Sequence, residues 1–389
     1  TMHSAKWNEH YDFTNRRIGV IGSGSSAIQI VPNLQKIAGA QLFCFVRSKT
    51  WISPPFGHET WDKLGIASYQ IDPEQRKKFA SDSAAYHKFR LTIEEDGNSI
   101  HGVTIKGTSM QIESQQEFEK HMHGKLAKRP DIFEALLPNF APGCRRLTPG
   151  IGYLEALVED NVDFVKQGIT NIEPTGVRTA DGKLHEVDVL VCATGFHSSA
   201  PPPFPVEGLN GKTLKQKWTD EERATNYLSL AVDEFPNHFM MLGPNAAIGS
   251  GSLTMMIESV GDYIVKCIRK IQKDDIKSMT VSPKRVNDFI EYCDSYFKQT
   301  VVMDDCKSWY RKGDKVTGLW PGSTLHCIEA LRSPRWEDFE YEYHENNQLA
   351  WLGNGWCANQ LEKKDLAWYL YPEFVSIPLL RRPEENETL

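Results

Sequence analysis

The feature that most constrains the fold is a glycine-containing segment near the start of the chain, between Arg16 and Arg47. Residues 18–21 form a short apolar run bounded by charge and glycine, which is typical of a strand buried in a parallel sheet. A glycine- and serine-rich turn follows at residues 22–26, and then a helical pattern and a second apolar run at 42–46. This order predicts a β-α-β unit whose glycine turn leads directly into the helix.

The turn has the composition of a phosphate-binding loop. Gly22 permits a sharp turn, Gly24 has no Cβ to keep a pyrophosphate from the backbone, and the small Ala27 lets the helix approach the strand. Free N–H groups at the helix start would face the anion. The alternative is an ordinary glycine turn. We predict a dinucleotide site, with these cofactor-binding residues: Gly22, Gly24, Ser25, Ser26 and Ala27.

The end of the second strand predicts which coenzyme binds. An NAD site usually carries an acidic residue there for the ribose hydroxyls, whereas this chain has Arg47 and Ser48. An arginine fork suits a 2′-phosphate, so NADP is favoured over NAD.

Composition narrows the class of protein. The 389 residues can form two or more domains, and a net charge of −7 gives no indication of a basic nucleic-acid surface. We find no apolar run of membrane-spanning length, and the polar opening does not resemble a signal peptide, so we expect a cytoplasmic protein. Ten tryptophans could line a pocket for a bulky hydrophobic substrate or simply pack a loop-rich C-terminal region.

The cysteines and histidines do not predict a metal site. Eight cysteines are scattered without a C-x-x-C pair, so we expect buried reduced thiols rather than disulfides or zinc ligands. His121 and His123 have no third ligand at a metal-site spacing, and we expect no bound metal.

Beyond the first unit, the pattern predicts a split sheet. Residues 51–145 have high helical propensity, interrupted by a glycine-containing loop at 95–107, and we expect a helical insertion there. The alternation then resumes, and we expect a helix at 153–158, strands at 162–165 and 187–192, short strands with a turn over 168–187, a strand at 239–242 and a helix at 252–272.

Several blocks together resemble a known family, the class B flavin monooxygenases, and in particular the Baeyer–Villiger type of fungal secondary metabolism. The blocks that carry the resemblance are the glycine loop, the strand ending in Arg47, Gly143-Cys144-Arg145-Arg146, Ala193-Thr194-Gly195-Phe196, Phe235-Pro236-Asn237, Gly243-Pro244-Asn245, Cys306-Lys307-Ser308-Trp309-Tyr310, Trp320-Pro321-Gly322-Ser323 and Arg335-Trp336-Glu337-Asp338.

The resemblance implies an α/β fold: a Rossmann-like NADP-binding domain with a helical insertion, plus the C-terminal part of an incomplete FAD-type α/β domain. The implied ranges are an interdomain linker at 1–15, the NADP domain at 16–50 and 146–195, the insertion at 51–145, and the FAD-type remainder with a C-terminal extension at 196–389. His3 and Trp7 keep the H-x-x-x-W spacing of the family's linker signature, with Asn8 where proline is usual. The glycine loop for FAD would then lie before Thr1, which is either a cut from a longer parent or a tag remnant.

The resemblance also implies residue roles. Arg146 resembles the active-site arginine, and Arg145 resembles the basic residue that helps to hold the NADP phosphate; read alone, the pair could be a solvated basic turn. Thr194 and Gly195 are implied to contact a cofactor at a strand end. The three residues implied to line the flavin are Gly243, Pro244 and Asn245.

The predicted function follows from these roles. We expect a truncated NADPH- and FAD-dependent Baeyer–Villiger monooxygenase that uses molecular oxygen on a bulky hydrophobic ketone of secondary metabolism. The alternatives are a redox-inactive relative that catalyses an isomerisation, cyclisation or hydrolysis, and an NADP-binding partner subunit. Without the first strands of an FAD domain, the region after Pro201 should expose a sheet edge or apolar face and favour self-association.

Overall fold

A computed structural model describes residues 1–55, 57–66, 71–196, 201–220 and 223–371. The chain divides into two compact units. The first consists of Thr1–Cys267 and Met279–Glu340, and it contains every predicted site residue. The second consists of Ile268–Ser278 and the described residues from Tyr341 onward.

The first unit is built around a five-stranded parallel sheet. Its strands, in spatial order, are β1 (Met2–His3), β8 (Val189–Cys192), β2 (Arg17–Ile21), β3 (Gln41–Phe45) and β4 (Val162–Val165). The predicted strands at 162–165 and 187–192 are therefore confirmed, and the apolar run at 18–21 lies in the centre of the sheet. Within the range 1–15 that the resemblance implies to be a linker, Met2–His3 add an edge strand beside β8.

The strand order reverses next to β2. From β2 the chain moves through α1 (Ser25–Gln35) to β3 and then β4 on one side, whereas β8 lies on the other side. Ile21 pairs with Phe45 of β3 and with Cys192 of β8, so these three strands end at the same edge. In open parallel sheets a ligand binds in the crevice at such a switch point.

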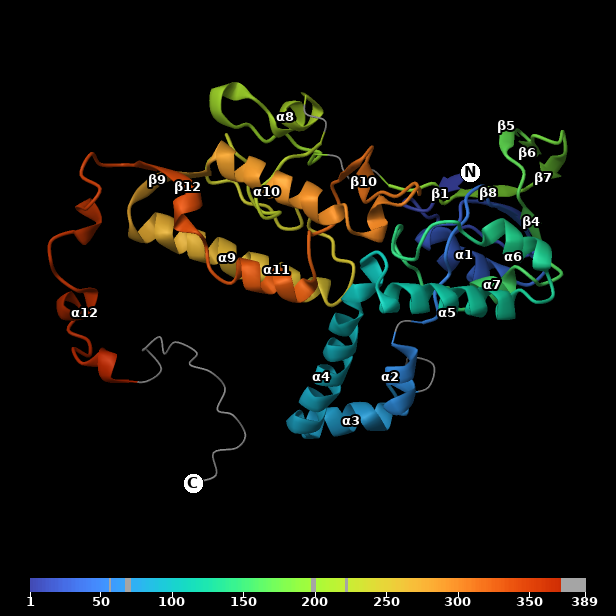
Figure 1. Cartoon of the computed structure of the whole chain (residues 1–389), viewed down its shortest axis with the longest axis horizontal. Helices are drawn as coiled ribbons and strands as arrows, with labels where there is room; N and C mark the ends of the chain where they lie inside the picture. Colours follow the sequence, from blue (N-terminus) through green and yellow to red (C-terminus); the bar gives the residue numbers. More distant parts are fainter. Residues whose placement is uncertain (56, 67–70, 197–200, 221–222, 372–389) are drawn as a thin grey trace. The chain divides into compact units, whose positions relative to one another are not determined.

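Helices from two parts of the sequence bury one hydrophobic core with the sheet. Helix α1 packs beside α7 (Tyr153–Ala156), as Figure 1 shows. The second half of the predicted insertion also joins this core through α5 (Ser109–Lys125) and α6 (Pro130–Leu136). These two helices are therefore part of the same packed unit as the nucleotide-binding sheet.

In the first half of the insertion, Trp51 and Ile52 join that core, but none of the described residues of its helices does. This half contains α2 (His58–Lys63), α3 (Pro73–Ser81), α4 (Ser83–Ser99) and the 3₁₀ turn η2 (Ile100–Thr104). Asp72 and Asp82 accept hydrogen bonds from the backbone N–H groups that open α3 and α4. The predicted loop at 95–107 is shorter than expected, because α4 continues to Ser99 and a 3₁₀ turn follows.

Short antiparallel strands follow β4. The three-stranded sheet of β5 (Ile169–Glu173), β6 (Gly176–Thr179) and β7 (Leu184–Glu186) confirms the short strands predicted over 168–187. Gly182 in the connecting turn has a φ of 82°, a conformation that glycine adopts without steric cost.

The region after Pro201 is mixed. Its α-helices are α8 (Leu214–Asp220), α9 (Leu253–Lys273), α10 (Pro283–Phe297), α11 (Thr324–Leu331) and α12 (Ala358–Leu361). Its strands are β9 (Ile276–Val281), β10 (Arg311–Lys312), β11 (Lys315–Val316) and β12 (Phe339–Tyr343). Its 3₁₀ turns are η3 (Leu209–Gly211), η4 (Val301–Met303), η5 (Trp336–Asp338), η6 (Ala350–Leu352) and η7 (Trp368–Leu370).

One predicted strand in this region is wrong. Residues 239–242 form no ladder; Phe239 makes a single bridge to Ala231, and Leu242 has a φ of 55°. A positive φ takes the backbone out of the extended region, so the apolar run ends in a turn. Met241 and Leu242 are about half exposed rather than buried in a sheet.

The prediction of reduced cysteines is also wrong for one pair. Cys144 and Cys306 form a disulfide, with their Cα atoms 6.4 Å apart. The remaining six are free thiols, of which four are buried. The two bonded cysteines are 162 residues apart in sequence, so no local spacing could indicate the pair.

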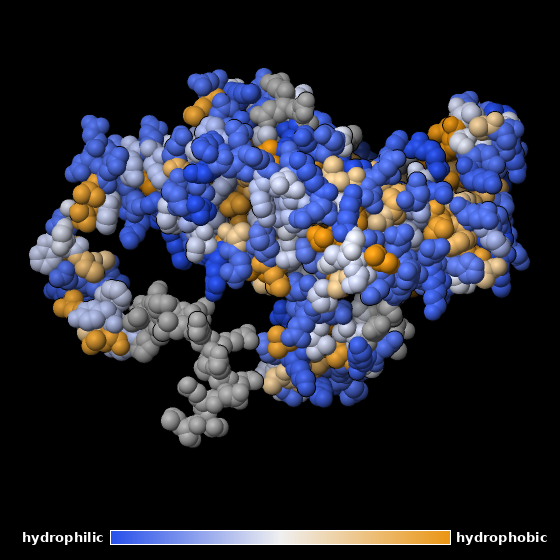
Figure 2. Space-filling model, viewed as in Figure 1, coloured by the Kyte–Doolittle hydropathy of each residue, from blue (hydrophilic) through white to orange (hydrophobic). Residues whose placement is uncertain are grey.

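The helices in the described part of the chain do not meet the requirements of a membrane span. No helix there combines the length and the apolar composition that a bilayer crossing requires. The face drawn in Figure 2 is predominantly hydrophilic, with its apolar side chains in separate patches.

Candidate functional site

Ten of the predicted site residues meet at the switch point of the parallel sheet. A cavity of about 850 Å³ opens there, and it is lined by the glycine turn after β2, the residues after β3, β4 and β8, and two distant loops. The lining residues are Ile21, Gly22, Ser23, Gly24, Ser25, Ser26, Phe45, Arg47, Ser48, Arg145, Arg146, Gln167, Gly168, Ile169, Ala193, Thr194, Gly195, Phe196 and Trp309.

Glycine serves a different purpose at each of the two positions in the turn. Gly22 has a φ of 127°, and a Cβ there would lie 2.4 Å from the carbonyl oxygen of Ala193. Gly24 is the N-cap of α1, and a Cβ there would meet nothing within 4 Å. Gly22 therefore lets two strand ends approach each other, whereas Gly24 keeps the space in front of the helix open.

The start of α1 presents free hydrogen-bond donors. No side chain caps the helix, so the first N–H groups have no side-chain acceptor at the N-cap. The Ser25 hydroxyl is 2.6 Å from that of Thr148, and the Ser23 hydroxyl donates to the Ser48 carbonyl over 3.1 Å. Ala27 is completely buried, as expected for a small residue between helix and strand. This cradle fits the pyrophosphate of a dinucleotide.

The cavity carries only positive formal charge among its described lining residues. Its three charged side chains are those of Arg47, Arg145 and Arg146. Arg145 is half-buried and donates to the carbonyl of Lys49 over 3.1 Å, and burial lowers the pKa of its guanidinium. An arginine remains charged even so, which makes the cavity selective for anions.

Arg146 lines the cavity beside a loop that is distant in sequence. Its guanidinium acts on the hydroxyl of Tyr310, a residue that is almost completely buried. Burial raises the pKa of Tyr310, and the nearby positive charge of Arg146 partly offsets that rise. Arg145 is thus hydrogen-bonded to the Lys49 carbonyl, and Arg146 lies near Tyr310.

Nine cavity residues were not predicted, and three of them, Ile21, Ser23 and Ala193, lie directly beside predicted ones. Gln167, Gly168 and Ile169 follow β4, and the position at the carboxyl end of a predicted strand was a usable signal. Phe45 and Phe196 are neighbours of predicted site residues. Trp309 lies far away in sequence, and only tertiary packing brings it to the cavity.

The two linker residues do not line the cavity. The His3 Nδ1 atom accepts a hydrogen bond from the backbone of Ala5, and its ring lies edge-on to Phe196 at 6.0 Å. Trp7 stacks on Phe13 at 5.5 Å. His3 therefore touches the cavity only through Phe196.

The predicted flavin residues lie elsewhere. Gly243 and Pro244 line a second cavity of about 410 Å³, which Trp309 also lines. Asn245 is buried, and its amide donates to the carbonyls of Val316 and Leu319, so it shapes the loop instead of facing the cavity.

The second cavity fits only part of an FAD molecule. Its described lining is largely apolar and includes Met240, Met241, Leu242 and Leu253, with no arginine or lysine. Such a surface suits an aromatic ring system but supplies no cradle for the FAD phosphates. The described residues also contain no group of three His, Cys, Asp or Glu side chains that could hold a metal ion.

The parallel sheet and the cavity at its switch point are those of a Rossmann-like α/β domain. Comparison with known proteins adds the relationship. The chain is 38% identical over 376 residues to the FAD-binding monooxygenase tazF of Aspergillus terreus, covering 95% of this chain and 66% of that protein. It is 33% identical to moxY of Dothistroma septosporum, covering 99% and 63%, and 32% identical to stcW of Emericella nidulans, covering 91% and 58%.

Solved structures share the fold. The closed structure of cyclohexanone monooxygenase matches with a TM-score of 0.71 at 21% identity, covering 88% of this chain and 70% of the other. An oxidized steroid monooxygenase bound to NADP matches with a TM-score of 0.67 at 23% identity, covering 87% and 69%. No family model matches the chain.

The chain is thus homologous to fungal FAD-binding monooxygenases and has the fold of Baeyer–Villiger monooxygenases, which confirms the resemblance predicted from its motifs. It spans 58 to 66% of the length of the three fungal relatives.

Proposed function

We propose that the protein is an NADPH- and FAD-dependent monooxygenase of Baeyer–Villiger type, which inserts oxygen next to a ketone in a secondary metabolite. In this proposal the present chain supplies the NADPH site and the active-site arginine. One observation supports it above all: the glycine cradle, Arg47 and the Arg145–Arg146 pair, which are far apart in sequence, line one cavity. The names of the fungal relatives support the flavin dependence.

The residues of the cavity have separable tasks. The N–H groups at the start of α1 bind the pyrophosphate, and Arg47 with Ser48 bind the 2′-phosphate. Bound FAD would accept a hydride from NADPH and activate oxygen. Arg146 provides a permanent positive charge for the negative charge that develops during oxygen insertion. Thr194 and Gly195 line the cavity at the end of β8, where they would contact the coenzyme.

A bulky hydrophobic ketone is the substrate class that we propose. Trp309 is 44% exposed and lines both cavities, and the second cavity is mostly apolar. Burial of such surfaces against a hydrophobic ligand is favourable, whereas a small polar ligand would leave them in water.

The test is an oxygen-uptake measurement on the purified 389-residue chain with FAD and a panel of hydrophobic ketones. We expect uptake that depends on NADPH and is much weaker with NADH. A colourless protein without NADPH-dependent uptake would contradict the monooxygenase proposal for this polypeptide. NADP⁺ binding without uptake would then favour a non-redox role or a partner subunit.

We also propose that the apolar face around the second cavity promotes self-association. Met241 and Leu242 are 49% and 51% exposed, and exposed apolar clusters favour protein contacts. Replacing both with serine should lower the mass seen by light scattering, because less apolar area is available for burial. A compact monomer before any substitution would refute this proposal.

A further inference from the structure

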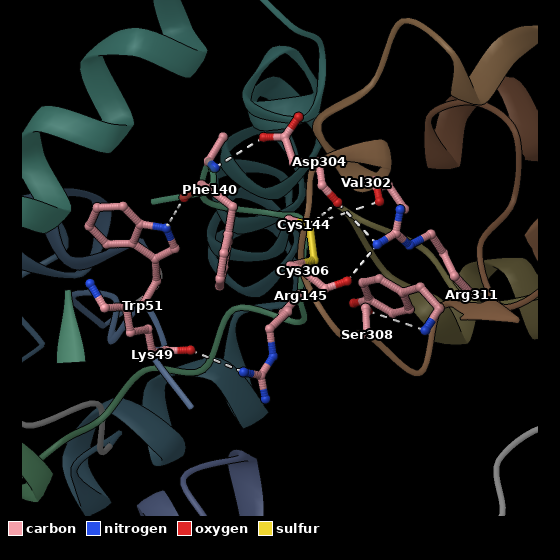
Figure 3. The surroundings of a disulfide bond; sticks show 12 residues. Lys49, Trp51, Phe140, Cys144, Arg145, Val302, Asp304, Cys306, Ser308 and Arg311 are labelled. Carbon is pink, nitrogen blue, oxygen red and sulfur yellow. Dashed lines mark hydrogen bonds between the residues drawn. A yellow bond between two sulfur atoms is a disulfide. The ribbon is translucent and has the colours of Figure 1, made fainter. Parts of the chain in front are cut away.

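The loop that carries Cys306, Trp309 and Tyr310 is joined to the arginine turn at two points. The first is the Cys144–Cys306 disulfide, which bonds the residue just before Arg145 to a loop 162 residues later (Figure 3). Cys144 is completely buried, and Cys306 is 7% exposed. The second is the approach of the Arg146 guanidinium to the Tyr310 hydroxyl, whose pKa it lowers. Arg145 directly follows the cross-linked Cys144, and Arg146 is the next residue.

The loop that carries Cys306 is itself held in place by side chains. The Asp304 carboxylate accepts from the backbone of Ala141 over 3.1 Å and pairs with Lys106 over 2.9 Å. Arg311 donates from one guanidinium nitrogen to the carbonyls of Asp304 and Cys306, as Figure 3 shows. The disulfide thus ties the arginine turn to a braced loop.

Tyr310 is equally well fixed. Its side chain is buried, and its backbone carbonyl accepts from the N–H groups of Thr317 and Gly318 at 2.8 and 3.0 Å. Arg146, by contrast, is exposed at the cavity. A long, exposed arginine has many rotamers, so its position depends on the few groups that restrain it.

We propose that the Cys144–Cys306 disulfide and Tyr310 are positioning elements for Arg146: together they hold its guanidinium at the cavity wall. The catalytic importance of this restraint rests on the function proposed above for Arg146. The restraint itself is a property of the fold and can be measured without turnover.

Reduction provides a reversible way to test the restraint. A dithiol such as dithiothreitol breaks the S–S bond, transfers two electrons and two protons to give two thiols, and leaves as its own cyclic disulfide. Cys144 and Cys306 then stay in place only through packing. Of the disulfide and Tyr310, only Tyr310 still restrains Arg146. Reoxidation by the oxidised dithiol should restore the original state.

The first readout is hydrogen exchange followed by mass spectrometry. After reduction we expect faster exchange in residues 143–146 and 304–311, with β2 and α1 unchanged. The second readout is the rate at which phenylglyoxal modifies Arg146, relative to Arg17 in the same sample. We expect this ratio to rise on reduction and to rise again in Tyr310→Phe, which keeps the buried ring but removes the hydroxyl.

Matched variants separate the bond from other thiols. The double variant C144S/C306S should behave like the reduced protein and lose its response to dithiothreitol, whereas Cys357→Ser, at an exposed cysteine of the second unit, should keep it. NADP⁺ affinity should change less than the reactivity of Arg146, because Gly22, Gly24 and Arg47 lie on segments apart from the cross-link and only Arg145 is next to it. Where turnover is measurable, we expect kcat to fall by about 10- to 100-fold with little change in the KM for NADPH, since a misplaced charge chiefly affects the transition state.

The outcomes distinguish this inference from the proposed function. Unchanged exchange and unchanged Arg146 reactivity after reduction and in Tyr310→Phe would overturn it, whether or not the protein takes up oxygen. Alkylation of Cys144 and Cys306 as free thiols in protein purified without reductant would also overturn it. Loss of the restraint together with an absence of oxygen uptake would support the positioning role and count against the monooxygenase instead.

Discussion

At the scale of single residues, we expect one glycine of the turn to be needed for folding and the other for coenzyme binding. Gly22 lies against the carbonyl of Ala193 with a positive φ, while Gly24 faces open space at the start of α1. The two residues look equivalent in a G-x-G motif. Alanine should therefore reduce stability at Gly22 and reduce coenzyme affinity at Gly24.

We predict that Gly22→Ala destabilises the protein by about 1–3 kcal/mol, because its Cβ would meet the Ala193 carbonyl in a strained conformation. Gly24→Ala should change the free energy of unfolding by no more than about 0.5 kcal/mol, since a poorer N-cap and a less flexible unfolded chain offset each other. It should nevertheless weaken NADP⁺ binding, because the methyl group enters the cavity. Denaturant unfolding and fluorescence titration of both variants provide the check; equal stabilities would contradict it.

We expect Arg47 to determine the preference for NADP⁺ over NAD⁺. Arg47→Ala should weaken NADP⁺ binding by about 10- to 100-fold, the usual value of hydrogen bonds to a charged group, and leave the affinity for NAD⁺ unchanged. Arg129→Ala is the control, because that arginine pairs with Asp131 and does not line the cavity. An unchanged NADP⁺ affinity in Arg47→Ala would remove the basis for assigning this coenzyme.

At the scale of elements, the sheet is tied together where β2 begins. Asp188, just before β8, accepts from the Arg17 backbone N–H over 2.8 Å and from its guanidinium over 2.9 Å. Glu186 pairs with the same guanidinium. The side-chain hydrogen bond from Arg17 lowers the pKa of Asp188 below its ordinary value of 3.8. The central strand pair is therefore clamped at the end away from the cavity.

This clamp predicts a pH dependence of stability. Because the pKa of Asp188 is lower in the folded protein, its contribution is fully present above pH 3.8 and is lost as the pH falls through the folded value. Asp188→Asn should therefore lower stability at about pH 7 and make little difference near about pH 2. Urea unfolding at both pH values measures this; a difference that is larger in acid would contradict the sign.

At the scale of the whole molecule, the cavity is a meeting point of segments that are distant in sequence. Its lining comes from the residues around positions 22, 47, 146, 168, 194 and 309, all within the first unit. The second unit contributes no lining residue among those described. Coenzyme binding should consequently affect the two units differently.

We predict that NADP⁺ at about 100 times its Kd stabilises the first unit by about 2.7 kcal/mol. Hydrogen exchange should slow in the six lining segments and remain unchanged in residues 341–371 of the second unit. NAD⁺ at the same concentration serves as the control and should protect less. Protection in the second unit alone would place the coenzyme elsewhere.

The sequence alone determined the local elements and the resemblance. The apolar run before Gly22, the strands after residue 161 and the basic turn at Arg145–Arg146 all depend on neighbouring residues, and each is where the pattern predicted. The wrong strand at 239–242 shows the limit of that logic, because an apolar run can also line a cavity.

Only the tertiary structure decided which distant segments meet. It brought Trp309 to both cavities, buried Asn245 in a loop network, and joined Cys144 to Cys306 across 162 residues. The physical reason is that periodicity and turn chemistry report short-range geometry. Contacts between remote segments depend instead on how whole elements pack to bury apolar surface and satisfy their polar groups.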